Sequence, residues 1–465
     1  MKKSLMLLYI LSLFFFQAFS QGTKKSEMET DPLVLEKLEQ WKDLKFGLLM
    51  HWGPYSQWGI VESWSLCSED EPWCKRKVKN YVDYCRDYVK LKNTFNPVKF
   101  NPEKWAAAAR YAGMKYVVFT TKHHDGFCMF DTRYTDYKIT DPGCPFHSHP
   151  RSNVAKEIFD AFRKQGFWTG AYFSKPDWNS NDYWAEEWAT PNRNMNYDIK
   201  RYPERWQRFA DFTFNQINEL TSGYGKVDIL WLDGGWVSAQ NGQDIEMPKI
   251  AAMARKNQPG IIVVDRAVGG KYENYRTPEQ EIPEKTPGYP WETCMTMASS
   301  WSYVPGDIYK PTNKIIHMLV DIVCKGGNYL LNIGPSPEGE WADSAYSRLQ
   351  EIGDWMQING EAIYNSRPVD PSKSENLCYL SNPNGNIYVI YLAGETEMKM
   401  PESIFVNGFQ PSGGSTIELL GKRGTLKWKA DGATGFRIFI PSAARNNPPC
   451  KHAWTFRILM NNIDR

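Results

Sequence analysis

The sequence predicts an α/β fold, a (β/α)8-like TIM barrel followed by a small C-terminal antiparallel β-sandwich, and three observations lead to it. Short apolar runs alternate with amphipathic helical stretches between about residues 44 and 368, as in parallel strands joined by crossover helices. Polar residues follow several of these runs directly, as functional groups do at the C-terminal ends of barrel strands. Beyond residue 368 the helical signal fades. A doubly wound sheet is the alternative for the first part.

The first region contains the runs that are expected to be strands, because each is short, apolar and enriched in β-branched or aromatic residues. The amphipathic stretches between and after them are expected to be helices. The strands are 46–50, 116–120, 168–173, 227–232, 261–264 and 329–333, and the helices are 102–112, 154–165, 203–222, 247–256, 312–325 and 344–359.

The second region is expected to consist of β-strands, because its apolar runs are separated by turn-forming sequences such as Asn-Pro-Asn-Gly and Asp-Gly. The runs are 379–380, 387–392, 416–420, 426–430 and 436–441. We therefore expect a signal peptide at 1–20, a barrel at 28–367, a β-sandwich at 368–445 and a loosely held tail at 446–465.

The N-terminus has the pattern of a secretory signal. Lys2 and Lys3 precede an apolar run at 5–16, and a small-x-small cleavage site follows at 18–20. The apolar run is too short to span a bilayer comfortably. We expect an exported protein, periplasmic or secreted, without a membrane span once the signal is cleaved; an uncleaved signal anchor is the alternative.

Composition excludes some partners. The formal net charge is +2 without a dense Lys/Arg block, so neither nucleic acid nor an anionic membrane surface is expected as a partner. Aromatic residues make up 14% of the chain and include 19 tryptophans, whose flat faces suit stacking on sugars, although core packing accounts for most of them.

The nine cysteines form no CxxC pair, so a structural zinc site is not expected. A disulfide bridge among Cys67, Cys74 and Cys85 is one option for an exported chain.

Three histidines follow expected strands: His51 in HWG, and His123 and His124 in KHHDG. Adjacent side chains of an extended segment point to opposite faces, so the His123–His124 pair is a poor chelator, and we expect no metal and no other cofactor. As hydrogen-bond partners for hydroxyl groups the three imidazoles make better sense. Structural histidines are the simpler alternative for each of them taken alone.

A pocket rich in His, Trp, Tyr and carboxylates suits a neutral polyhydroxylated ligand, since the sequence has no phosphate loop, serine elbow or dinucleotide glycines. Cleavage of a glycosidic bond requires two carboxyl groups, one to attack and one to protonate the leaving oxygen. Asp233, which ends the run VDILWLD before two glycines, is the candidate nucleophile. An ordinary Asp-Gly turn is the alternative interpretation.

Five ordered motifs extend this argument: KFGLLMHWGPYS, KYVVFTTKHHDGFCMFDTRYTDYKIT, VDILWLDGGW, PWETCMTM and NYLLNIGPSPEG. Together, over roughly residues 45–360, they resemble the α-L-fucosidases of glycoside hydrolase family 29. The resemblance implies a barrel that is sometimes irregular, a C-terminal β-sandwich, and a retaining double displacement on terminal α-L-fucose.

The resemblance also implies roles for single residues. Asp233 matches the nucleophile, and the positions that match residues of the sugar pocket are His51, His123, His124, Tyr172, Trp231, Arg266 and Trp301. Trp64 matches the tryptophan of a Glu-Trp pair, but Ser63 precedes it here, with Glu62 one place earlier, so a hydroxyl-binding role for Glu62 stays open. Trp301-Ser302-Tyr303 replaces the usual Trp-Gly-Tyr, which implies a differently shaped aromatic floor.

Several glutamates compete for the role of acid/base. Glu279 in YRTPEQEIP best matches the family's loop carboxylate and is favoured. Glu292 in PWETC is the alternative, and Glu273 and Glu281 are the remaining candidates. In a retaining enzyme the acid/base and the nucleophile lie roughly 5 to 5.5 Å apart.

The resulting hypothesis is an exo-acting retaining α-L-fucosidase that hydrolyses terminal α-L-fucose from fucosylated oligosaccharides or glycoconjugates through a glycosyl-enzyme. A related retaining glycosidase for another deoxy or galacto-configured sugar, or a non-catalytic carbohydrate-binding homologue, is the alternative. The sequence does not indicate which linkage is cleaved or the oligomeric state.

Overall fold

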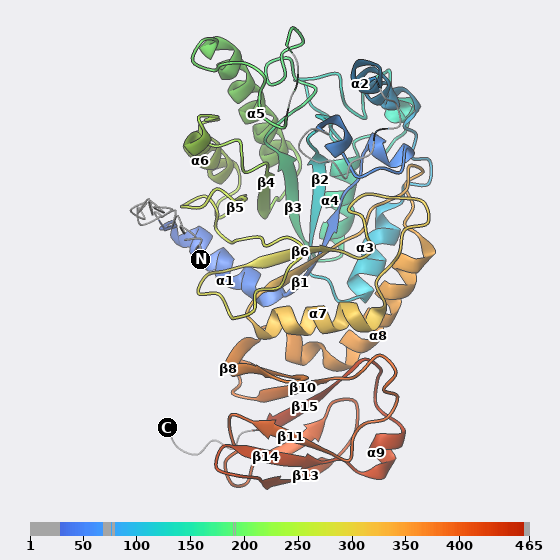
Figure 1. Ribbon diagram of the computed structural model, residues 1–465, viewed down its shortest axis with the longest axis vertical. Helices are drawn as coiled ribbons and strands as arrows, with labels where there is room; N and C mark the ends of the chain where they lie inside the picture. Colours follow the sequence, from blue (N-terminus) through green and yellow to red (C-terminus); the bar gives the residue numbers. More distant parts are fainter. Residues whose placement is uncertain (1–27, 68–75, 77–79, 189, 191, 460–465) are drawn as a thin grey trace, which may run out of the picture.

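The computed structural model describes residues 28–67, 76, 80–188, 190 and 192–459 (Figure 1). The expected signal peptide and Cys74 lie outside this part of the chain. Seven of the cysteines within it are free thiols: Cys85, Cys128, Cys144, Cys294, Cys324, Cys378 and Cys450. Within the same residues, no helix is both long enough and apolar enough to cross a membrane.

The first domain is built on a parallel sheet in the order β5-β4-β3-β2-β1-β7-β6, which confirms the predicted barrel-like fold class. Its strands are β1 (Phe46–Met50), β2 (Tyr116–Lys122), β3 (Trp168–Ser174), β4 (Ile229–Asp233), β5 (Ile262–Asp265), β6 (Glu292–Thr296) and β7 (Asn328–Asn332). The described residues contribute seven strands where an ideal barrel has eight, so the regular sheet stays open between β5 and β6.

The gap between β5 and β6 is spanned by residues 272–280, which we call the bridging segment. On one side, Asp265 donates its backbone N–H to the carbonyl oxygen of Tyr272 at 2.9 Å. On the other, the N–H of Gln280 donates to the carbonyl oxygen of Cys294 at 3.0 Å. The segment therefore closes the barrel with isolated bridges in place of a regular strand.

The strands are apolar because both of their faces are covered. Inward-facing side chains such as Leu49, Val118 and Trp231 fill the barrel interior, and the helices cover the outer face. Trp41 of the N-terminal helix belongs to the same buried cluster as these inward-facing residues. Its ring stacks on that of Tyr275 in the bridging segment, with 4.0 Å between the ring centroids.

The helices lie outside the strands, as expected for crossover connections. They are α1 (Pro32–Leu44), α2 (Tyr81–Val89), α3 (Pro102–Tyr111), α4 (Val154–Lys164), α5 (Pro203–Gly223), α6 (Met247–Asn257), α7 (Thr312–Cys324) and α8 (Asp343–Ile363). Short 3-10 turns occur at Pro54–Gln57, Trp64–Cys67, Lys90–Thr94, Pro145–Ser148 and Ala239–Asn241. The sequence did not predict α1, α2 or β6.

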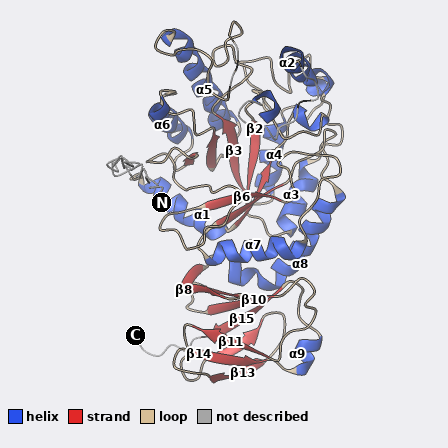
Figure 2. Cartoon of the chain, in the orientation of Figure 1, coloured by secondary structure: helices blue, strands red, loops and turns tan. Residues whose placement is uncertain are grey.

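The second domain is almost entirely β-structure (Figure 2). Its strands are β8 (Arg367–Ser374), β9 (Leu377–Ser381), β10 (Ile387–Leu392), β11 (Ser403–Asn407), β12 (Thr416–Leu419), β13 (Thr425–Ala430), β14 (Gly435–Phe439) and β15 (Ala453–Leu459), with one short helix, α9 (Ser442–Asn446). They pair antiparallel in the order β11-β14-β13-β12-β15-β10-β9-β8. The sheet encloses a core that includes Val389, Phe436 and Phe456, so the predicted fold class is confirmed here as well.

The expectation of a loosely held tail at 446–465 is wrong for Ala453–Leu459. These residues form β15, which pairs with both β10 and β12 inside the sheet. Trp454, Phe456 and Ile458 point into the core of the second domain, and the carbonyl oxygen of Ala453 accepts a hydrogen bond from the indole of Trp355 at 3.0 Å. Because both faces of this run are covered, it is ordered like a central strand.

Helices α7 and α8 lie between the barrel and the second sheet (Figure 1). Residues of β9 and β10, such as Leu380 and Ile390, belong to the same hydrophobic cluster as these helices. The pocket described below is lined by residues in or after β1 to β6, and none of its lining residues belongs to α7, α8 or the second domain.

Candidate active site

A cavity of about 530 Å³ lies at the C-terminal ends of the barrel strands. It brings together most of the residues that the sequence singled out: His51, Glu62, Trp64, His123, His124, Tyr172, Trp231, Asp233, Arg266, Glu279 and Trp301. The exceptions are the three other acid/base candidates, Glu292, Glu273 and Glu281. The cavity is also lined by Gly235, which follows Asp233 by two positions, and by six residues that the sequence did not single out: Leu49, Arg193, Trp236, Ala267, Thr277 and Cys294.

Asp233 is the last residue of β4, and its carboxylate is held from two sides. The Tyr172 hydroxyl donates to Oδ2 at 2.6 Å, and Arg266 donates to Oδ1 at 3.0 Å. Burial alone would raise the pKa of Asp233, but the charge of Arg266 and the other contacts outweigh it and hold that pKa far below its ordinary value. The carboxylate is therefore ionised and fixed in orientation.

The glycine after Asp233 is required by the turn. Gly234 has a φ of +87°, and a Cβ there would lie 2.3 Å from Cδ of Pro176. A larger residue at this position would push the end of β4 away from the chain that follows β3, and with it the carboxylate of Asp233.

Arg266 joins Asp233 to the bridging segment. The same guanidinium that contacts Asp233 donates through its second terminal nitrogen to Oε2 of Glu279, and its Nε donates to the Thr277 hydroxyl at 3.1 Å. The side chain of Glu279 is 44% exposed, whereas that of Asp233 is 14% exposed. One planar group thus orients two carboxyls, one deep in the cavity and one at its rim.

The three histidines line the cavity as neutral rings. Burial lowers the pKa of His51 and of His124 to about 4 and lowers the pKa of His123 well below its ordinary value. Each Nδ1 has a fixed partner: Asn332 Oδ1 for His51 at 2.9 Å, Ser63 Oγ for His123 at 2.6 Å, and Ser174 Oγ for His124 at 2.7 Å.

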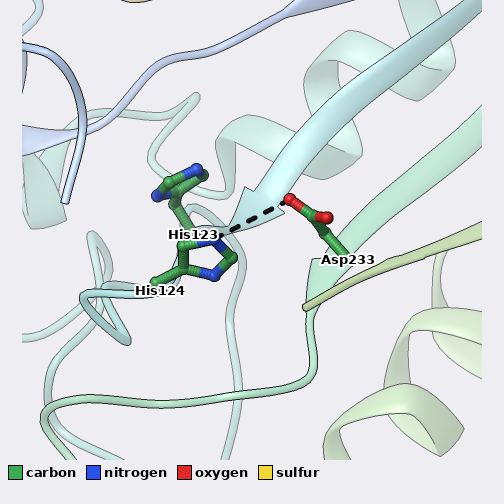
Figure 3. A group of neighbouring side chains, drawn as sticks. All are labelled: His123, His124 and Asp233. Carbon is green, nitrogen blue, oxygen red and sulfur yellow. Dashed lines mark ion pairs between the residues drawn. The ribbon is translucent and has the colours of Figure 1, made fainter. Parts of the chain in front are cut away.

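The expectation that His123 and His124 point to opposite faces is wrong. Both rings face the cavity beside Asp233, with their centroids 4.3 Å apart (Figure 3). The reason is local: β2 ends at Lys122, and the chain turns immediately after it, so the alternation of an extended strand no longer applies.

His123, His124 and Asp233 could in principle supply three ligand atoms to a metal, because these atoms lie within 4.8 Å of one another. The surrounding charges do not favour a cation. Arg266 already brings a full positive charge to within 3.0 Å of Asp233, and the Tyr172 hydroxyl occupies the second carboxylate oxygen. The donor set thus fits hydrogen bonding to a neutral ligand better than it fits metal binding.

Glu62 lies in the wall of the cavity and is almost fully buried. Burial raises its pKa to about 8, so the side chain is a neutral carboxylic acid at neutral pH. Its Oε1 accepts a hydrogen bond from the backbone N–H of Ser302 at 2.8 Å. Ser302 is the residue that replaces glycine in the Trp-Ser-Tyr sequence, and its hydroxyl also donates to the carbonyl oxygen of Ile60 at 2.5 Å.

Glu292 lies in the barrel interior instead of the cavity. Its side chain is fully buried and accepts hydrogen bonds from the Tyr116 hydroxyl at 2.5 Å and from the Trp231 indole at 3.2 Å. Burial raises the pKa of Glu292 to about 7. The other two glutamates do not line the cavity either: Glu273 accepts hydrogen bonds from the backbone of 267–269, and Glu281 is exposed.

An aromatic wall stands at one side of the cavity. The Arg193 guanidinium lies 4.9 Å from the ring centroid of Trp64 and 5.3 Å from that of Trp236. Behind Trp64, the ring of Trp178 faces a larger cavity of about 980 Å³. We assign the chemistry to the smaller cavity because Asp233, Glu279 and the three histidines lie there.

Two carboxyls oriented by one guanidinium, beside neutral imidazole rings at the mouth of a barrel, meet the requirements for cleaving a glycosidic bond. This combination defines the class: the chain is a glycoside hydrolase.

The comparisons with known proteins give the family. The sequence model described as alpha-L-fucosidase matches residues 13–361, and the model of the alpha-L-fucosidase C-terminal domain matches residues 370–459. The tissue alpha-L-fucosidase of Mus musculus is 29% identical over 96% of this chain and 97% of its own length. That of Rattus norvegicus is 30% identical over 91% and 90%.

Among solved structures, alpha-L-fucosidase isoenzyme 1 from Paenibacillus thiaminolyticus superposes with a TM-score of 0.76 at 29% identity, covering 92% of this chain and all of that one. The chain therefore belongs to the α-L-fucosidase family, glycoside hydrolase family 29.

Proposed function

We propose that the protein is an exo-acting retaining α-L-fucosidase that releases terminal α-L-fucose from fucosylated oligosaccharides or glycoconjugates. The observation that carries the proposal is the contact of one Arg266 guanidinium with both Asp233 and Glu279 in a single cavity. A retaining reaction requires a close carboxyl pair, and a shared guanidinium keeps the two side chains close.

In the first step, a carboxylate oxygen of Asp233 attacks the anomeric carbon and forms an ester with it. Glu279 delivers its proton to the glycosidic oxygen, so the bond from the anomeric carbon to the aglycone breaks and the alcohol leaves. The low pKa of Asp233 supports its role, because the attacking group must be unprotonated. The contacts with Tyr172 and Arg266 limit its motion, which favours attack from one direction.

In the second step, Glu279 takes a proton from a water molecule, which attacks the anomeric carbon of the glycosyl-enzyme. The ester bond breaks, Asp233 is released as a carboxylate, and the sugar leaves with its original anomeric configuration. The partial exposure of Glu279 supports this role, because water and the aglycone both reach the cavity from the rim.

The apolar part of the cavity supports a 6-deoxy sugar. Leu49, Cys294 and Trp301 line it beside the polar groups, and such a surface suits the methyl group of fucose. A galacto-configured sugar with a hydroxyl group at C6 would bury that hydroxyl against apolar atoms at a cost in binding free energy.

Export is proposed from the N-terminal sequence pattern. Relatives of this chain are named tissue and plasma fucosidases, which is consistent with that expectation.

The substrate is tested with aryl α-L-fucoside, aryl α-L-galactoside and aryl β-D-galactoside, followed by NMR of the first-formed sugar. We expect the α-L-fucoside to have the highest kcat/KM and the first product to be α-L-fucose. Defined fucosylated oligosaccharides should lose only terminal fucose. Preference for either galactoside, or β-L-fucose as the first product, would contradict the proposal.

A further inference from the structure

We infer that Ser174, Ser63 and Asn332 fix the tautomers of the three cavity histidines. The ring proton lies on Nδ1 in His51 and His124 and on Nε2 in His123. His51 and His124 therefore offer the ligand an acceptor, and His123 offers it a donor. Ser174 and Ser63 are thus positioning residues, and their role for the substrate rests on the function proposed above.

The hydrogen on His124 is fixed through Ser174. The Ser174 hydroxyl donates its single hydrogen to the carbonyl oxygen of Pro176 at 2.5 Å. Its contact of 2.7 Å with Nδ1 of His124 must then be a hydrogen bond donated by the imidazole. In the neutral ring the remaining nitrogen, Nε2, carries a lone pair and faces the cavity.

The distance to the nucleophile agrees with this tautomer. Nε2 of His124 lies 3.8 Å from Oδ2 of Asp233, beyond hydrogen-bond distance (Figure 3). Two acceptors that face each other stay apart, whereas an Nε2–H would draw the carboxylate closer. Ser174 therefore keeps a third hydrogen-bond donor, in addition to Tyr172 and Arg266, away from the carboxylate of Asp233.

His51 has the same tautomer for a different reason. Oδ1 of Asn332 accepts from both the backbone N–H and Nδ1 of His51, at 3.2 and 2.9 Å. The orientation of the Asn332 amide is fixed because its Nδ2 donates to the carbonyl oxygen of Trp301 at 2.6 Å. Nδ1 of His51 is therefore a donor, and its Nε2 is an acceptor.

His123 has the opposite tautomer. The fully buried Ser63 hydroxyl accepts a hydrogen bond from the backbone N–H of Asp125 at 2.9 Å and contacts Nδ1 of His123 at 2.6 Å. A buried hydroxyl is satisfied when its own hydrogen is also donated, and Nδ1 of His123 is the acceptor within reach. The hydrogen of the neutral ring then lies on Nε2, as a donor.

The pattern gives the cavity a polarity that three identical side chains would not have by themselves. A ligand hydroxyl can accept from His123 and donate to His51 or His124, whose pKa values are too low for a positive charge at neutral pH. Ser63 is also the residue that separates Glu62 from Trp64 and departs from the Glu-Trp pair. Its presence is explained by its hydrogen bond to His123.

Neutron diffraction from ligand-free crystals of the perdeuterated protein at neutral pH measures these positions directly. We expect deuterium on Nδ1 of His51 and His124 and on Nε2 of His123. Deuterium on Nε2 of His124, or on Nδ1 of His123, overturns the inference. This measurement requires no substrate, so it stands apart from the success or failure of the proposed function.

Kinetics with an aryl α-L-fucoside test the consequence. Ser174→Ala frees His124 to donate to Asp233, and we expect kcat to fall roughly 10- to 100-fold with a smaller change in KM. Ser174→Thr retains a hydroxyl and should recover most of the rate. Ser63→Ala should mainly raise KM, because the donor to a ligand hydroxyl is no longer fixed.

Ser65→Ala is the matched control. Its buried hydroxyl has no hydrogen-bond partner among the residues that the structure describes, and we expect the variant to keep the parental rate. Ser174→Ala and Ser65→Ala variants with equal kcat values would contradict the role of Ser174. If Ser174→Ala does not fold, the neutron map of the unmodified protein still decides between the tautomers.

Discussion

Asp233 and Glu279 face the same cavity, but the backbone segments that carry them differ in structure. Asp233 ends a regular strand whose neighbours on both sides pair with it in register. Glu279 belongs to the bridging segment, which is held to β5 and β6 only by isolated contacts. The difference teaches that Asp233, the proposed nucleophile, is fixed by the sheet itself, whereas Glu279, the proposed proton donor, is positioned by Arg266 and by the closure of the barrel.

Asp233→Asn removes the attacking group without changing its size, so it should have the largest effect. We expect kcat/KM for an aryl α-L-fucoside to fall by roughly 10⁴-fold or more, because the proposed ester forms on the Asp233 carboxylate and an amide oxygen is a poor nucleophile. Thermal unfolding should show a folded protein. A variant that keeps a tenth of the parental rate would contradict the assignment.

Glu279→Gln should have a smaller effect that depends on the leaving group. With a natural fucoside the leaving alcohol needs a proton, and we expect a loss of roughly 10²- to 10⁴-fold in kcat/KM. With an aryl fucoside whose phenol leaves easily, the loss in kcat/KM should be much smaller. Glu284→Gln, an exposed residue further along the same loop, serves as the control. Equal losses on both substrates would argue against Glu279 as the acid.

Arg266→Lys should remove the shared contact between Asp233 and Glu279, because an ammonium group cannot contact both carboxyls as the planar guanidinium does. We expect kcat/KM to fall roughly 10- to 1,000-fold. Addition of guanidinium ion should recover part of the rate if the missing contact is the cause. An unchanged kcat/KM would show that the bridge has no role in the reaction.

The smallest expected effect is on the pH dependence of stability, and it comes from the buried glutamates. The pKa of Glu292 is raised to about 7 by burial, while in the unfolded chain it returns to about 4.3. Between these pH values the folded state holds one more proton than the unfolded state, so the free energy of unfolding falls as pH rises and levels off above about pH 7.

Urea unfolding between pH 4.5 and 8 measures this dependence. Glu292→Gln should have a flatter profile than the parent protein, by on the order of 3 kcal/mol over the interval. Glu62 shifts in the same direction, to about 8, so Glu62→Gln should act similarly over a slightly wider range. Asp233 shifts the other way and contributes stability that is lost at acid pH. Parallel profiles for parent and variants would contradict the neutral state of these acids.

The regular part of the fold was predictable from sequence because its apolar runs are continuous. Phe46–Met50 and Ile387–Leu392 form strands with the predicted bounds. Glu292–Thr296 was missed as a strand because its residues are not a plain apolar run, although they are all buried. The bridging segment could not be predicted, since its hydrogen bonds depend on where β5 and β6 come to lie.

The location of a candidate-site residue was predictable where that residue stands at the end of a strand, as for Asp233 and His51. It was less predictable where a residue leaves the strand, and the shared direction of His123 and His124 depends on a turn that begins after Lys122. The roles of Ser63 and Ser174 had no signal in the sequence, because they depend on which atoms meet in three dimensions.

Azide rescue of two alanine or glycine variants tests the central claim, that Asp233 and Glu279 are the nucleophile and the acid/base. With an activated aryl α-L-fucoside, Asp233→Gly lets azide take the place of the nucleophile, and the account predicts β-L-fucosyl azide. Glu279→Ala still forms the glycosyl-enzyme, which azide attacks from the other face to give α-L-fucosyl azide. Rescue of Glu292→Ala with α-L-fucosyl azide, and none for Glu279→Ala, would contradict the account.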